Sequence, residues 1–129
     1  MRAFAVAALG GISLFVGGIG ILTIMTIAVR ERRAEIGLLR AIGARRSQVL
    51  RLFLLESLFL SAIGGIGGLA LGLGLAFIIK FAAPALPVHP SLEYALLAEL
   101  LAVVIGLVAG VLPARHASGL QPLDALRAE

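Results

Sequence analysis

The chain has 129 residues, of which 60% are hydrophobic and 14% charged, with a formal net charge of +4 and no cysteine. Soluble domains average about 45–50% apolar and about 25% charged residues, so this composition argues against a soluble globular protein. The lack of cysteine excludes disulfides, thiolate metal sites and cysteine nucleophiles. The surplus arginines stand beside apolar runs without interleaved aromatic residues, so no nucleic-acid partner is expected. We expect an integral membrane protein.

Three apolar runs, at about 4–29, 52–79 and 95–112, are long enough to cross a bilayer as helices. A crossing needs about 20 apolar residues, because the hydrocarbon core is about 30 Å thick. The first two runs exceed this need, so they should tilt or project from the membrane. Pro113 should help to end the third helix, since proline cannot donate a helical hydrogen bond, and a tail follows at 113–129. The predicted fold class is an all-α membrane protein with three transmembrane helices.

The arginines predict the orientation of these helices. Seven arginines lie between Arg30 and Arg51, two more lie in the tail, and the Pro-rich connector 81–94 has no lysine or arginine. Short loops rich in lysine and arginine stay in the cytoplasm. We therefore expect a multi-pass protein of the bacterial plasma or inner membrane. Segment 30–47 and the C-terminus should face the cytoplasm, and the N-terminus should lie outside.

The Arg-rich segment 30–47 should contain a short amphipathic helix. Ile36, Leu39 and Ile42 recur at helical spacing on one face, and Gly43 can end the helix. One interpretation is a surface helix that its arginines anchor to anionic lipid. The other is a docking element that presents apolar side chains to a cytoplasmic partner. The residue pattern favours neither.

Glycines at a spacing of four predict close contacts between helices. Membrane helices pack through small residues, because water cannot drive their association. The helix-packing candidates are Gly64, Gly68 and Gly72 in the second run and Gly106 and Gly110 in the third. These faces could meet within the chain or between two copies of it.

Side chains suited to catalysis are few. His89 and His116 have no acidic residues at metal-ligand spacing and are interpreted as loop histidines. Ser57 and Ser61 lack a nearby base, so their hydroxyls should hydrogen-bond within the helix. The chain has no G-x-x-x-x-G-K-[ST] motif and cannot bind ATP by a phosphate loop. We predict no catalytic, cofactor-binding or metal-binding residue and no enzymatic activity on this chain.

Two separated motifs carry a resemblance to a known family. The segment 29–44 resembles the cytoplasmic coupling segment of FtsX-like permeases, the membrane subunits of ABC systems such as macrolide exporters and lipoprotein-releasing complexes. The pair Glu56-Ser57 and the tail 113–127 also resemble the family pattern, although Arg33-Ala34 departs from it and His116 replaces a second basic residue. The resemblance implies that ten consecutive residues contact an ATPase: Glu35, Ile36, Gly37, Leu38, Leu39, Arg40, Ala41, Ile42, Gly43 and Ala44.

The resemblance also implies a function and partners. This chain would be the C-terminal membrane domain of a permease that normally has four membrane helices and a large extracytoplasmic domain. An ATPase on a partner chain or domain would push the coupling segment, with Ile36, Leu39 and Ile42 filling an apolar cleft, and the movement would serve export or lipoprotein extrusion. A second permease copy or homologue would complete a dimer within the lipid bilayer. The alternatives are a signalling subunit that activates an extracytoplasmic enzyme, or a small self-associating membrane protein without an ATPase.

Overall fold

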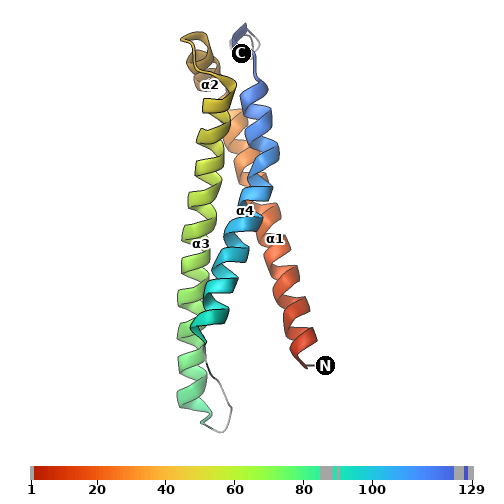
Figure 1. The fold of residues 1–129 in the computed structure, drawn as a ribbon, viewed down its shortest axis with the longest axis vertical. Coiled ribbons are helices and arrows are strands. Elements are labelled where there is room, and N and C mark those ends of the chain that lie inside the picture. Colours follow the sequence, from red (N-terminus) through yellow and green to blue (C-terminus); the bar gives the residue numbers. More distant parts are fainter. Residues whose placement is uncertain (1, 85–88, 90, 124–126, 128–129) are drawn as a thin grey trace.

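The computed structural model describes residues 2–84, 89, 91–123 and 127, with side chains described from Phe4 onward. The described chain consists of four helices and has no strand: α1 (Arg2–Glu31), α2 (Arg33–Ala41), α3 (Arg46–Ala82) and α4 (Leu92–Gly119) (Figure 1). The segments Phe4–Glu31, Arg46–Ala82 and Leu92–Gly119 are long and apolar enough to cross a membrane. The predicted all-α architecture is therefore confirmed for the described residues, with three helices long and apolar enough to span a membrane.

The three long helices are not packed equally against one another. α3 and α4 lie side by side, and α1 packs mainly against α4, with few contacts to α3. Figure 1 shows α1 diverging from the other two helices toward its N-terminus, while the opposite ends converge beside α2. We call the converging end, formed by the end of α1, α2, the start of α3 and the end of α4, the Arg-rich end.

The helices are longer than the apolar runs predict. α3 begins at Arg46, six residues before the predicted span, and α4 begins at Leu92 and extends to Gly119. The expectation that Pro113 ends the third helix is wrong, because Pro113 lies buried inside α4. Proline removes one hydrogen bond from the ladder. The helix continues because Ala114 and Ala117, in the next turn, are fully buried against its neighbours.

α2 ends in a glycine cap, as the sequence predicts. Gly43 has a φ of 102°, in the left-handed region that favours glycine. The N–H groups of Gly43 and Ala44 donate to the carbonyls of Arg40 (3.2 Å) and Leu39 (3.0 Å). This pair of bonds is the Schellman motif, and it satisfies carbonyls that the helix end leaves free. α3 then begins after Arg45, whose N–H donates to Gln48 Oε1 at 2.7 Å.

The buried side chains gather at the Arg-rich end. This cluster, here called the junction core, draws residues from all four helices: Met25, Val29, Ile36, Val49, Phe53, Ala114 and Ala117. Ile21, Leu50, Leu54 and Leu120 pack around it. The junction core therefore joins α2 to each of the three long helices.

Candidate coupling site at the Arg-rich end

α2 is attached to the bundle through one face. Ile36 is only 2% exposed and belongs to the junction core, and Gly37 beside it is buried as well. The sequence grouped Ile36 with Leu39 and Ile42 as exposed apolar side chains. Ile36 does not share their exposure, because its side chain is buried in the junction core, to which α1, α3 and α4 also contribute. Ile36 anchors α2 instead of presenting a free surface.

α2 and its C-cap residue also expose three large apolar side chains. Leu38 is 60% exposed, Leu39 39% and Ile42 75%. α2 lies outside the segments that are long and apolar enough to cross a membrane, so it is not itself a candidate membrane span. A compact group of exposed apolar side chains in a polar setting marks a contact surface for another molecule. We call Leu38, Leu39 and Ile42 the α2 apolar surface.

Polar groups frame the α2 apolar surface. Glu35 is exposed in the first turn of α2. Arg40 is partly buried, and its Nη1 donates to the carbonyl of Ala44 at 3.0 Å, which fixes the loop that follows α2. Ala41 and Gly43 are exposed and Ala44 is partly exposed. The ten predicted coupling residues thus form one continuous element with a buried anchor and an exposed apolar side.

The Glu56-Ser57 pair connects the site to α3 and α4. Glu56 Oε1 lies 3.6 Å from Arg32 Nη1, at the junction between α1 and α2. Ser57 is fully buried, and its hydroxyl donates to the Leu54 carbonyl at 2.8 Å. Ser61 likewise donates to the Ser57 carbonyl at 2.9 Å, so both hydroxyls bond within the helix as predicted. Because each serine hydroxyl is satisfied by a carbonyl of α3, Ser57 and Ser61 can pack against α4 without leaving an unpaired polar group.

α3 and α4 approach closely where serines meet glycines. A Cβ atom added to Gly106 would overlap Ser61, and one added to Gly110 would overlap Ser57. Gly106 and Gly110 therefore lie at a helix contact. Gly64, Gly68 and Gly72 are exposed, with no atom near the position of an added Cβ, so they make no such contact within the chain.

The face of α3 that touches α4 was missed from the sequence. Its buried or contacting residues recur at a spacing of four: Val49, Phe53, Ser57, Ser61 and Gly65. The glycine pattern had predicted the row Gly64, Gly68 and Gly72, which is displaced by one residue along α3 from the row that contacts α4. Counting serine as a small packing residue would have identified the correct row.

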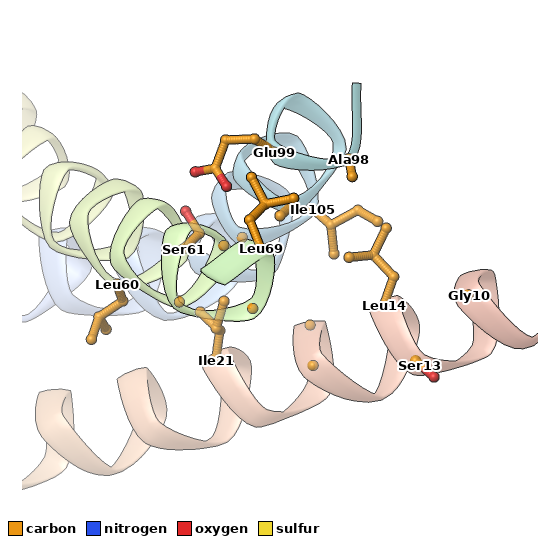
Figure 2. A pocket seen from close by; sticks show the side chains of 17 residues that line it. Gly10, Ser13, Leu14, Ile21, Leu60, Ser61, Leu69, Ala98, Glu99 and Ile105 are labelled. Carbon is orange, nitrogen blue, oxygen red and sulfur yellow. The ribbon is translucent and has the colours of Figure 1, made fainter. Parts of the chain in front are cut away.

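A cavity of about 730 Å³ opens between α1, α3 and α4, on the side of the junction core away from α2. Figure 2 shows Leu14 and Ile21 extending from α1, and Glu99 reaching from α4 toward α3 on the same side as Ser61. The Glu99 carboxyl lies against the backbone of Gly65, where any larger side chain would collide with it. We call this space the outer cavity. Gly64 and Gly68 line it, so these predicted packing residues face open space within one chain.

The tail motif contributes its small residues to the junction core. Pro113, Ala114 and Ala117 are buried, whereas Arg115 and His116 between them are exposed. His116 is therefore a residue of α4 and not a loop histidine as predicted. Part of the second half of the motif, at 124–126, lies outside the described residues.

Known proteins share this pattern of residues over most of the chain. The model of the FtsX-like permease C-terminal family matches residues 7–122. The chain is 48% identical over 92% of its length to a macrolide export ATP-binding/permease protein MacB of Hyphomonas neptunium, of which it covers 18%. It is 45% identical over 92% of its length to the MacB protein of Escherichia coli K12, again covering 18%.

A further relative carries no ATP-binding description. The chain is 41% identical over 96% of its length to the uncharacterized ABC transporter permease YknZ of Bacillus subtilis, of which it covers 31%. The chain thus spans less than a third of the length of these relatives. With the matched residues extending from α1 to the end of α4, the chain belongs to the FtsX-like permease family, as its C-terminal region.

Proposed function

We propose that this chain couples ATP hydrolysis by a partner ATPase subunit or domain to conformational change across the membrane. The α2 apolar surface receives the ATPase, and the long helices transmit the movement to the outer side. The activity served is export or extrusion of a substrate by mechanical transmission. A second permease copy completes the assembly, with the exposed Gly64, Gly68 and Gly72 row available to it.

One observation carries this proposal: the same short helix has an exposed apolar face and a buried anchor. Ile36 contacts a core to which α1, α3 and α4 all contribute. Interiors packed in this way transmit displacement, because close-packed side chains resist compression. A force applied at Leu38, Leu39 and Ile42 would therefore reach all three spanning helices through Ile36. A helix attached only by lipid contacts would not supply this connection.

The test is a charge placed on the α2 apolar surface of the full-length protein. Ile42→Asp should abolish stimulated ATP hydrolysis in proteoliposomes and, where the ATPase is a separate chain, its retention during purification. Ile42 is 75% exposed, so the change should leave folding intact. Burying one such side chain in a cleft is worth roughly 1.5–3 kcal/mol, which sets the expected loss of affinity at about tenfold or more.

Ser47→Asp is the matched control, because it adds the same charge at an exposed position at the start of α3. It should leave ATP hydrolysis near the wild-type rate. The variant Ile36→Asp is unsuitable for this test, since it would place a charge in the junction core and disturb the fold itself. Wild-type hydrolysis and retention in Ile42→Asp would refute docking at this surface.

The proposed orientation has its own test. Single cysteines at Ser47, Ser91 and Ser118 report on the start of α3, the start of α4 and the end of α4. With the N-terminus outside and the C-terminus in the cytoplasm, an impermeant thiol reagent on intact cells should label only the Ser91 position. Permeabilised cells should label all three, which controls for reactivity. Labelling at position 47 in intact cells would overturn the orientation.

A further inference from the structure

A second cavity, of about 440 Å³, lies between α1 and α4 at the Arg-rich end. Three basic side chains from different helices line it: Arg30 at the end of α1, Arg33 at the start of α2 and His116 in the last turn of α4. No acidic residue lies among its described lining residues. The rest of the lining is Thr26 and four apolar residues: Leu22, Val29, Leu112 and Pro113. We call this space the basic cavity.

The basic cavity holds a donor without a partner. Arg33 Nε is buried and has no hydrogen-bond partner among the described residues. The single ion pair found in the described residues uses Arg32 and Glu56, so neither Arg30 nor Arg33 is neutralised by a carboxylate there. Buried donors in folded proteins are normally satisfied. The Nε–H of Arg33 is therefore a donor that an acceptor from another molecule could satisfy.

The geometry suits a molecule that is anionic at one end and apolar at the other. Guanidinium groups recognise phosphate through paired N–H donors. Leu22 and Leu112 extend the lining away from the arginines, along helices apolar enough to span a membrane. The arginines stand where the apolar run of α1 ends, and a helix that spans the membrane would carry them near the lipid headgroups there. Basic cavities between membrane helices at this depth bind anionic lipid headgroups.

We propose that the basic cavity binds the phosphate headgroup of one anionic phospholipid, from the leaflet at the Arg-rich end. Arg30 and Arg33 hold the phosphate, His116 closes the site from α4, and an acyl chain lies along Leu22 and Leu112. The bound lipid links α1, α2 and α4 at the junction between the membrane and the coupling element. This inference does not depend on the identity of the ATPase or on the docking surface of α2.

The test measures lipid binding to the purified full-length protein by native mass spectrometry in a neutral detergent. Dioleoylphosphatidylglycerol should bind at least tenfold more tightly than dioleoylphosphatidylcholine, which has the same acyl chains and no net charge. Each arginine near an anionic headgroup contributes roughly fivefold in affinity. The double variant Arg30→Gln with Arg33→Gln should therefore weaken phosphatidylglycerol binding roughly 25-fold.

The matched control is Arg45→Gln with Arg46→Gln, which removes two charges from exposed positions outside the basic cavity. It should change the affinity by no more than about twofold under the same conditions. An equal loss in both double variants would mean unspecific attraction to the whole basic face and would overturn the proposal. Unchanged binding in Arg30→Gln with Arg33→Gln would overturn it as well.

Two further arms complete the design. Inorganic phosphate at millimolar concentration should not displace phosphatidylglycerol, and displacement would assign the cavity to free phosphate instead of lipid.

His116→Arg adds a permanent charge at an exposed position, so it should tighten phosphatidylglycerol binding several-fold without disturbing the fold. If the double variant loses its helical circular dichroism, the His116→Arg variant becomes the decisive measurement. An unchanged phosphatidylglycerol affinity in His116→Arg would then refute the site.

Discussion

The two halves of this helical bundle are built from different side chains, although both belong to the same three long helices. At the Arg-rich end, large apolar residues such as Phe53, Met25 and Val29 are fully or almost fully buried together. Beyond the junction core, small residues surround the outer cavity, and α1 separates from α3 (Figure 1). One end is a packed junction, and the other leaves the helices free to change their spacing.

This difference follows from the surroundings of each half. Apolar side chains gain little from contacting one another within lipid, because lipid tails are equally apolar. Helices in lipid therefore associate through complementary shapes. Small residues let two backbones approach closely, as Gly106 and Gly110 do where α4 meets α3. At the Arg-rich end water is near, so burial of Ile36 and Val49 also contributes free energy. The three long helices are therefore held together firmly at the Arg-rich end and more loosely at the other end.

The largest effect should come from emptying the junction core. Phe53 is 2% exposed, so Phe53→Ala should lower the free energy of unfolding by about 3 kcal/mol or more, through lost contacts and a cavity. The matched control is Phe59→Ala on the same helix, where the side chain is 65% exposed and a change within about 0.5 kcal/mol is expected. Denaturant unfolding in mild detergent, followed by helical circular dichroism, measures both. Similar losses in the two variants would contradict a core confined to the Arg-rich end.

A smaller effect should separate the two glycine rows. Gly110→Leu would overlap Ser57 and force α3 and α4 apart, so we expect a loss of about 1–3 kcal/mol in stability. A Cβ atom at Gly68 meets no atom of the chain, and Gly68 faces the outer cavity, so Gly68→Leu should change the stability of the isolated chain by less than about 0.5 kcal/mol.

The same glycine pair also tests association between copies. If the Gly64, Gly68 and Gly72 row packs against a second permease copy, Gly68→Leu should shift the oligomer distribution in light scattering while the monomer remains stable. An unchanged distribution would leave this row without a packing role. A marked fall in monomer stability would show that the outer cavity closes in the folded chain.

The smallest effect concerns the ion pair between Arg32 and Glu56. Both side chains are partly exposed, at 51% and 32%, so water and salt screen their attraction. A double-mutant cycle with Arg32→Gln and Glu56→Gln should give a coupling energy of about 0–1 kcal/mol that falls with added salt. A coupling above about 2 kcal/mol, unaffected by salt, would make this pair a principal link between α2 and α3.

Several features could be predicted from the sequence because they depend on local chemistry. The three spans follow from run length and hydrophobicity, and the end of α2 at Gly43 follows from the need for a positive φ. The motifs at 29–44 and 113–127 predicted the family, and the family model that matches residues 7–122 confirms it. The helix ends were predicted less well, since Pro113 looks like a stop signal until the burial of Ala114 and Ala117 is known.

In the candidate site, too, the sequence could predict the arrangement of residues around a helix but not their burial. The sequence placed Ile36, Leu39 and Ile42 on one face, because periodicity locates residues around a helix axis. It could not say which of them a neighbouring helix covers, and only the tertiary structure separates buried Ile36 from exposed Leu39 and Ile42. Likewise, glycine spacing identified small-residue rows on α3 and α4, but the partner of Gly110 proved to be Ser57.

Hydrophobic length and charge act residue by residue, so they are enough to predict a membrane protein with three long apolar helices and a basic element between the first two. The tertiary structure decided which faces meet, where the bundle is closed and where it is open. That choice depends on the shapes of side chains distant in sequence, such as Gly110 against Ser57 and Gly106 against Ser61. Shape complementarity between helices is a property of pairs of surfaces, and a single run of residues does not contain it.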